Sequence, residues 1–487
     1  MTEASPICRS PTARCLAGIA TVDITPPVGI YHRFWGAASH DKATGVHRPL
    51  RGSVLILADV SDDEKPPLED CSIIIALDHC LFRPDDMDRF RAETVGFLNV
   101  NPQQLIVTFS HTHSGGHIAR ARGDLPGGEL IGPYLDSLPE KIANACRSAF
   151  EALQPVTMTA ASAPCAMGHQ RDFRDPVKGE TVCGFNPDDD TVYPVTVMRM
   201  CNAENQVVGT IVNYPCHPTT LAWENTLISP DYIGATREIV ERATAVPCLF
   251  LLAPCGDVGP RYGFVGDVEV ADANGRQLGY AALSALESMD PPGSDYVYGG
   301  PVISGATLGT WYPKPQTKQR IAETSHFQHD QLIVEVPYLD DLQTVEETEQ
   351  EFAEHLAAEQ SCRERGDEKQ ARDHRALAER CRRTLERIRP LPKGAAYPYR
   401  VEIFRLGDLI WIFVEGEPYH EIQKRLTERF PKKSIMLITL TDGARCGYLP
   451  IREAYTDASL YQVQIAVVAP GSLETIADAV IERVKGK

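Results

Sequence analysis

Residues 105–117 read LIVTFSHTHSGGH, an apolar run that passes directly into a polar cluster. Leu105–Phe109 is short, apolar and rich in β-branched side chains, which is typical of a buried β-strand. Gly115 and Gly116 then allow the backbone to turn tightly beside the histidines. The stretch therefore predicts a buried strand that ends in a loop with chemically active side chains.

The same arrangement recurs along the chain. Six further apolar runs end in polar or glycine-containing clusters and are predicted to be strands: residues 53–58, 72–77, 207–212, 248–252, 409–414 and 434–440. Five stretches carry apolar residues at helical spacing: residues 133–153, 231–245, 275–289, 419–430 and 473–484. This alternation predicts an α/β fold of mixed, buried sheets flanked by helices.

Residues 344–389 differ from the rest of the chain, because they are dense in Glu, Arg, Gln and Ala and nearly free of aromatic residues. We expect two charged helices, broken near Gly366, that form a hairpin inserted into a single domain spanning residues 1–487. A charge run of this kind usually forms a solvated face. The alternatives are an oligomer contact, which would make the protein a homo-oligomer, and a lid over a cleft.

The composition excludes several classes of function. The 487 residues carry a formal net charge of −18, which argues against non-specific nucleic-acid binding and against docking onto an anionic membrane. No stretch reaches the ~18 consecutive apolar residues of a membrane span, and the N-terminus lacks the apolar core of a secretory signal. We expect a cytoplasmic protein with a small-molecule substrate. The 14 cysteines form no CxxC pair, and we expect them to be reduced thiols that pack as small apolar residues.

Five polar side chains each follow a predicted buried strand: His111, His217, Asp257, Glu417 and Tyr448. Strand ends along one edge of an α/β sheet converge, and binding sites are commonly built there. A metal ion needs several nitrogen and oxygen donors at about 2.0–2.2 Å, held by a rigid scaffold. The positions therefore predict a metal site at this edge.

Each of the histidine and aspartate positions also has a simpler interpretation. His111 and His113, two positions apart, can form a metal motif or a hydrogen-bonded pair in a loop. A single histidine such as His217 is more often structural than a ligand. Asp257 can fix its loop or cap a helix, or it can orient a ligating histidine.

The same holds for the last two positions. Glu417 precedes a predicted helix, where a carboxylate suits the N-terminal dipole. Tyr448 would be read as packing, because a phenol titrates near 10 in water. A divalent metal can nevertheless stabilise the phenolate.

Taken together, a series of ordered segments resembles the neutral/alkaline, non-lysosomal ceramidase family over about residues 16–485. The segments are AGIATVDITPPVG (17–29), GVHRPLRGSVLIL (45–57), SHTHSGG (110–116), NYPCHPTTLAWENTLISPDYIG (213–234), CGDVGP (255–260), EGEP (415–418) and CGYLPIREAY (446–455). A set of blocks in this order is far more specific than any one of them.

The resemblance implies a fold like that of the ceramidase catalytic domain and a bound Zn²⁺. The family's four zinc ligands fall on His111, His217, Glu417 and Tyr448. The second histidine of the first motif, which assists at the substrate carbonyl or the water, falls on His113.

Two further catalytic assignments follow. The family's arginine near the oxyanion falls on Arg171 in GHQRDFRDP, with Arg174 as the alternative. Asp257 would orient a ligand or handle a proton.

The chain departs from the family in two respects. The serine of the family's G-D-x-S-P segment is replaced by Gly259 in CGDVGP, which excludes a serine-dependent mechanism at this position. We also expect a catalytic domain without the family's C-terminal β-sandwich, since the sequence ends at Lys487 after the last predicted helix. Both departures argue against a long-chain membrane lipid as the substrate.

We therefore expect a zinc-dependent hydrolase that uses metal-activated water to cleave an amide bond of an N-acyl compound, for which lipid- and sugar-derived molecules are both candidates. The alternatives are a zinc esterase or other carbonyl- or glycoside-type metal hydrolase, and a catalytically inactive ceramidase-like binding protein. HxH after a strand also occurs in amidohydrolase barrels and metallo-β-lactamase folds. The former needs a suitably placed later lysine, which we do not find, and the latter needs Asp and His where this chain has Gly115 and Gly116.

Overall fold

The computed structural model describes residues 6–60, 65–443 and 445–486. Its largest sheet has eight strands: β2 (Thr12–Asp23), β4 (Arg51–Ala58), β5 (Ser72–Leu77), β6 (Leu105–Phe109), β7 (Gln154–Cys165), β11 (Tyr193–Cys201), β12 (Val207–Tyr214) and β14 (Cys248–Leu252). Their order is β14–β12–β11–β7–β2–β4–β5–β6. The pairs at the two edges, β12 with β14 and β5 with β6, are parallel, and those between them are antiparallel.

A second sheet packs against the inner face of the first. Its strands are β18 (Phe327–Pro337), β19 (Ala396–Leu406), β20 (Leu409–Val414) and β22 (Ser434–Ile438), in that order. Side chains along β20 alternate between the two faces: Trp411 and Phe413 join Leu55 and Ile74 of the large sheet in one apolar layer, whereas Ile412 belongs to another. Both faces of β20 are thus buried, which explains its uninterrupted apolar sequence.

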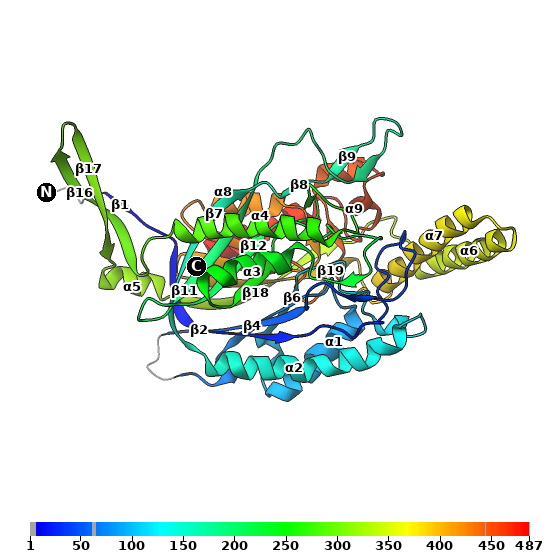
Figure 1. Ribbon diagram of the computed structural model, residues 1–487, viewed down its shortest axis with the longest axis horizontal. Coiled ribbons are helices and arrows are strands. Elements are labelled where there is room, and N and C mark those ends of the chain that lie inside the picture. The colour runs from blue at the N-terminus through cyan, green and yellow to red at the C-terminus, as the bar shows by residue number, and fades with distance from the viewer. Residues whose placement is uncertain (1–5, 61–64, 444, 487) are drawn as a thin grey trace.

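Helices cover the outer faces of both sheets (Figure 1). The helices α1 (Pro84–Leu98), α2 (Ile131–Glu151), α3 (Tyr232–Thr244) and α4 (Val268–Glu287) lie on the large sheet, and α8 (Glu421–Arg429) and α10 (Ser472–Lys485) lie on the second sheet. The body of the protein is therefore a four-layer arrangement of helices, two stacked sheets and helices.

The two edges of the large sheet approach each other. β14 and β6 stand at opposite ends of the strand order, yet β14 contacts both β5 and β6. The segment after β22 bridges them, because Thr439 N donates to Leu252 O at 2.9 Å and Thr108 Oγ1 donates to Thr439 O at 2.7 Å. The loops that follow β6, β12, β20 and β22 consequently meet at one end of the stacked sheets.

Two hairpins project from this body at opposite ends (Figure 1). One consists of α6 (Val345–Glu364) and α7 (Glu368–Ile388), and the other of β16 (Ser294–Ile303) and β17 (Thr307–Pro315), with β1 (Ile7–Cys8) paired to β16. The remaining short elements are β3 (Gly45–Val46), β8 (Gly168–Gln170), β9 (Asp172–Arg174), β10 (Thr181–Cys183), β13 (Leu227–Ile228), β15 (Val258–Pro260), β21 (Glu417–Pro418), β23 (Tyr448–Leu449), α5 (Lys318–Thr324), α9 (Tyr461–Gln464) and the 3-10 helices η1 (Leu68–Asp70), η2 (Pro102–Gln104), η3 (Arg120–Arg122), η4 (Gly128–Leu130) and η5 (Arg452–Thr456).

The predicted α/β class, with mixed sheets, flanking helices and an inserted helical hairpin, is confirmed. Each predicted strand and helix is present, with some ends displaced: α4 begins at Val268 rather than at residue 275, and β22 ends at Ile438 rather than at residue 440. The sequence patterns did not single out α1, β7, β11, β16–β19 or α5. The interpretation of residues 1–487 as one domain stays a prediction.

Two further expectations concern the whole chain. Within the described ranges, none of the helices combines the length and the apolar character needed to cross a membrane. The 14 cysteines all fall in these ranges and form no disulfide, and all but Cys8 and Cys183 are buried. This agrees with the prediction that the cysteines pack as small apolar residues, and the cytoplasmic location stays a prediction.

Candidate metal centre

The four predicted metal ligands come from four separate segments. His111 follows β6 and His217 follows β12, whereas Glu417 and Tyr448 lie in the two-stranded parallel sheet β21–β23. In that sheet Glu417 is the register partner of Tyr448, so their side chains leave neighbouring strands next to each other. Gly416 makes this possible, because its φ is +68° and a Cβ atom there would lie 2.4 Å from a backbone oxygen.

The donor atoms of these residues crowd together. Glu417 Oε2 lies 3.2 Å from His111 Nε2 and 3.0 Å from His217 Nε2, and Tyr448 Oη lies 3.0 Å from His217 Nε2. The donor atoms of the two histidines and Glu417 all lie within 4.8 Å of one another. Ligands at 2.0–2.1 Å from a tetrahedral ion are about 3.3 Å apart. The observed spacing therefore fits the edges of a tetrahedral site.

The other ring nitrogens of the two histidines determine which nitrogen faces this point. His111 Nδ1 donates to Cys80 O at 2.8 Å, and His217 Nδ1 donates to Cys255 O at 2.6 Å. The neutral rings then carry no proton on Nε2, and both lone pairs face the Glu417 carboxylate. Such atoms repel one another at this distance unless a proton or a cation lies between them. The residues present thus fit a divalent cation.

The charge states of the centre support this interpretation. Burial disfavours the charged form of Glu417, but His111 and His217 beside it hold the pKa of the carboxyl well below its usual range. Burial also opposes protonation of His111, yet Cys80 and Glu417 raise its pKa well above the ordinary value, while burial lowers the pKa of His217 to about 3. A bound cation would provide the positive charge that His111 otherwise provides by taking up a proton.

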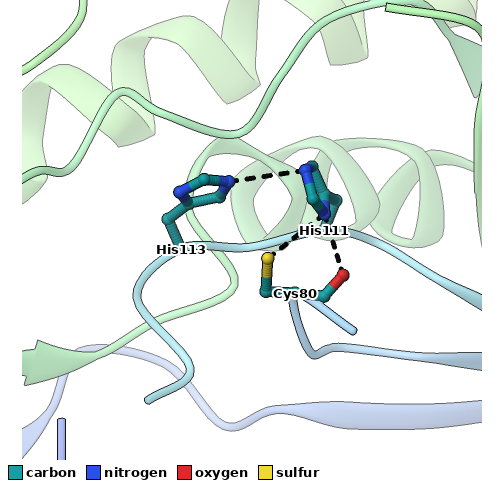
Figure 2. A group of neighbouring side chains, drawn as sticks. All are labelled: Cys80, His111 and His113. Carbon is teal, nitrogen blue, oxygen red and sulfur yellow. Dashed lines mark hydrogen bonds between the residues drawn. The ribbon is translucent and has the colours of Figure 1, made fainter. Parts of the chain in front are cut away.

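His113 and Cys80 lie next to His111, as Figure 2 shows. His113 Nε2 is 3.4 Å from His111 Nε2, and Cys80 Sγ is 3.2 Å from His111 Nδ1. The loop that carries both rings is strained, because the φ of His111 is +67°. A left-handed conformation at a non-glycine residue costs of order 1–3 kcal/mol and is concentrated at functional sites.

Arg171 lies behind Tyr448. Its Nη2 donates to Tyr448 Oη at 3.1 Å and to Gly256 O at 2.7 Å. Burial and the neighbouring Glu417 raise the pKa of Tyr448 well above its ordinary value, and the Arg171 guanidinium opposes them. Arg171 therefore favours the phenolate form, which a metal-bound tyrosine requires.

The structure also separates the two alternatives for the arginine. Arg174 is exposed and pairs with Asp457 at 3.4 Å, away from Tyr448. Gly259 lies beside Arg171, since a Cβ atom on the glycine would be 3.5 Å from the arginine side chain. Gly259, at which the sequence resemblance leads one to expect a serine, is thus adjacent to the centre and has room for a small side chain.

Asp257 is close to the centre, but its carboxylate bonds elsewhere. Its Oδ1 accepts a hydrogen bond from the His420 N–H at 2.7 Å, just before α8 begins, and its backbone oxygen accepts one from Arg171 N at 2.9 Å. Burial raises the pKa of this carboxyl to about 7. In the described part of the chain no hydrogen bond joins Asp257 to His111 or His217. Its predicted catalytic role stays a prediction, and its contacts position β15 against α8.

The centre opens into a cavity of about 340 Å³ that His113, Glu417 and Tyr448 help to line. Ligand pockets typically measure about 300–1,000 Å³, so the cavity suits a compact small molecule. An aromatic group and a cationic group share its lining: Phe34, Trp35 and Phe264, and Arg83, Arg383 and Arg387. Phe34 and Trp35 lie against His113, with ring centroids 4.5 and 5.3 Å from it.

Sequence reasoning missed these lining residues and Cys80. Cys80 comes three positions after β5, so the rule that polar residues follow buried strands would have found it. Phe34 and Trp35 lie in a segment without regular structure, and Arg383 and Arg387 lie in the charged run. Neither of these two segments has a sequence pattern that indicates a binding site.

The sequence matches no protein-family model and no curated protein. Solved structures do resemble it. A ceramidase complexed with C2 has a TM-score of 0.63 and 14% sequence identity, and the alignment covers 98% of this chain and 76% of that one. The neutral ceramidase from Pseudomonas aeruginosa has a TM-score of 0.59 and 13% identity, over 97% of this chain and 74% of that one. The chain therefore has the fold of neutral ceramidases.

Proposed function

We propose that this protein is a zinc-dependent hydrolase that cleaves the amide bond of an N-acyl compound. Ceramidases, whose fold it shares, act on such a bond in ceramide. The resemblance of the sequence blocks to the ceramidase family also implies hydrolysis of an amide bond.

One observation carries the proposal: the imidazoles of His111 and His217 both turn Nε2 toward one oxygen of Glu417, at 3.2 and 3.0 Å. Backbone carbonyls hold the proton on the opposite ring nitrogens. With both rings neutral, this group presents acceptors to acceptors, an arrangement that either a proton on His111 or a bound cation relieves. That arrangement is the one that metal ligands adopt.

His111, His217, Glu417 and Tyr448 would hold the zinc. When bound, zinc supplies Lewis acidity, which lowers the pKa of water to about 7 and polarises a carbonyl. Arg171 holds the Tyr448 oxygen through Nη2, and His113 presents a ring nitrogen beside His111 at which a proton is taken up or released.

The net reaction needs no serine. The amide C–N bond breaks, the acyl carbon gains a hydroxyl group from water, and the amine nitrogen gains the proton. Gly259, at the family's serine position, therefore leaves hydrolysis intact as a class of reaction. Whether the N-acyl compound is a lipid is a separate matter, on which the cavity of about 340 Å³ favours a compact one.

The experiment is metal analysis of His111→Ala beside wild-type protein, with exposed His326→Ala as the matched control. We expect close to one zinc ion per wild-type chain, removed by a chelator together with amidase activity, and restored with it. His111→Ala should lose both, and His326→Ala should keep both.

A full zinc complement in His111→Ala would refute the ligand assignment. Zinc without turnover of any N-acyl amide or ester would instead favour the inactive binding protein. Faster turnover of esters than of matched amides would favour the esterase.

A further inference from the structure

The cavity wall near α7 carries more positive charge than neighbouring carboxylates balance. Four arginines gather there against two glutamates, in a chain whose net charge is −18. The arginines are Arg83, Arg122, Arg383 and Arg387, and the glutamates are Glu379 and Glu386.

Three of the four arginines form ion pairs with these glutamates. Arg122 is buried and its Nη2 lies 2.9 Å from Glu379 Oε1 and 3.1 Å from Glu386 Oε1. Arg83 Nη2 lies 2.8 Å from Glu386 Oε2, and Arg383 Nε lies 2.8 Å from Glu379 Oε1. Each carboxylate is thus shared by two guanidinium groups.

Arg387 has no such partner: within the described ranges no carboxylate or hydrogen-bond acceptor pairs with its guanidinium. Its stem packs on Gly447, where a Cβ atom would lie 3.4 Å from Arg387 Cδ. Gly447 precedes Tyr448, and Arg387 lines the cavity together with Tyr448 and Glu417. In the described part of the chain, this guanidinium therefore has no direct ion-pair or hydrogen-bond partner, and Glu417 acts on it only from across the cavity.

Such a group favours an anionic ligand. A guanidinium taken out of water loses hydration that only an anion replaces well, and arginine matches oxyanions with paired N–H donors. Arg83 and Arg383 add to the positive potential at the same wall. Because the protein as a whole repels anions, a local excess of arginine indicates selective binding rather than general attraction.

We infer that the substrate carries an oxyanion, such as a carboxylate or a sulfonate, on its amine half, and that Arg387 binds this group. The inference rests on the proposed amide hydrolysis. Phe34 and Trp35 pack against His113, whereas Arg387 packs beside Tyr448. Arg383 lies over Phe34, but Arg387 and the two aromatic rings flank different residues of the centre, so the acyl chain lies on the aromatic group and the charged amine half lies at Arg387.

The substrate class is tested with three amides that share one acyl chain: hexanoylglycine, hexanoyltaurine and neutral hexanoylethanolamine. Zinc-loaded wild-type protein should hydrolyse at least one of the two anionic amides with a kcat/KM about 10–100-fold above that of the neutral amide. Preference for the glycine compound assigns a carboxylate, and preference for the taurine compound assigns a sulfonate.

Arg387→Met keeps the apolar stem and removes the charge. It should abolish the preference by lowering kcat/KM for the anionic amides about 10–100-fold, with the neutral amide changed less than about threefold. Arg387→Lys should restore part of the loss. The matched control is Arg372→Met, on the same helix but outside the cavity, which should retain the wild-type preference.

Titration calorimetry on zinc-free protein provides a readout that does not need turnover. Wild-type protein should bind the preferred anionic amide at least about tenfold more tightly than hexanoylethanolamine, and Arg387→Met should not.

Turnover of the neutral amide as fast as the anionic ones, unchanged in Arg387→Met, would overturn the inference and leave the hydrolase intact. Tighter anion binding to zinc-free protein without hydrolysis of any amide would uphold the anion site and reject the hydrolase. Thermal melts show whether Arg387→Met folds. If it does not, the comparison of Arg387→Lys with wild-type protein tests the anion site instead.

Discussion

The two walls of the cavity are built on different principles. On the wall formed by the strand ends, His111, His217 and Glu417 are aimed by loop backbone, through carbonyl hydrogen bonds and a paired strand. On the wall near α7, Arg122 and Arg383 are held by ion pairs between side chains. Backbone placement fixes donor atoms closely enough for a metal, whereas ion pairs place charge without fixing a coordination geometry. Under the proposed function, the first wall supplies the chemistry and the second selects which compounds enter.

Arg122→Met is expected to cause the largest loss of stability. It also tests whether the arginine wall can be weakened without any loss of zinc. It leaves Glu379 and Glu386, whose side chains are only 10% and 12% exposed, with one partner fewer each. Removing one partner of a buried ion pair typically costs about 3–5 kcal/mol. The free energy of unfolding, measured by urea denaturation, should fall by that amount. Zinc content should stay at the wild-type level, because Arg122 contacts none of the four ligands.

The control for this variant is Arg363→Met on α6. Its pair with Glu359 is an exposed i,i+4 contact, so its loss should change stability by about 0.5 kcal/mol or less. Loss of zinc in Arg122→Met would show that the two walls are not independent.

Glu379 should give a smaller, pH-dependent effect on the same wall. Burial would raise the pKa of its carboxyl, but Arg383 and Arg122 lower it from 4.5 to about 2. Its charged form therefore stabilises the fold fully above about pH 4.5, and this contribution is lost as the pH falls toward 2. Wild-type protein should exceed Glu379→Gln in unfolding free energy by roughly 3 kcal/mol at most near neutral pH.

The difference between the two proteins should shrink as the pH falls from about 4.5 to about 2, as followed by urea denaturation at several pH values. Glu364→Gln, on the exposed end of α6, should show no such pH-dependent difference. If the unfolding free energies of wild-type protein and Glu379→Gln differ by the same amount at every pH, the Glu379 carboxyl is not ionised in the folded state.

Much of the fold was predictable where a strand is buried on both faces. The limits of β5, β6, β14 and β20 match the apolar runs, because such strands show no polar alternation. The start of α4 was missed, since its first turns contain the buried polar residues Asp272 and Asn274. The β16–β17 hairpin was missed because most of its side chains are exposed and no apolar pattern marks it.

The same contrast holds for the candidate site. The gathering of His111, His217, Glu417 and Tyr448 at one point could be predicted, because each was expected to follow a buried strand and strand ends converge. Their role as metal ligands stays a prediction. The role of Arg387 could not be predicted, because its lack of an ion-pair partner depends on which carboxylates the other arginines bind. That pairing exists only in the folded chain, so residues 344–389 read as a solvated charge run in the sequence.

The smallest expected effect concerns the tyrosine on the strand-end wall. Tyr448→Phe removes one oxygen and keeps the ring, which stacks on His217 at a centroid distance of 6.0 Å. If the oxygen binds zinc, the affinity for zinc should fall about 10–100-fold, or about 1.4–2.7 kcal/mol, measured by competition with a chelator. Tyr461→Phe is the control, because Tyr461 lines the same cavity and packs on the Tyr448 ring. Equal zinc affinity in both variants would reduce the centre to His111, His217 and Glu417, and would leave the Tyr448 hydroxyl as a partner of Arg171 rather than of the metal.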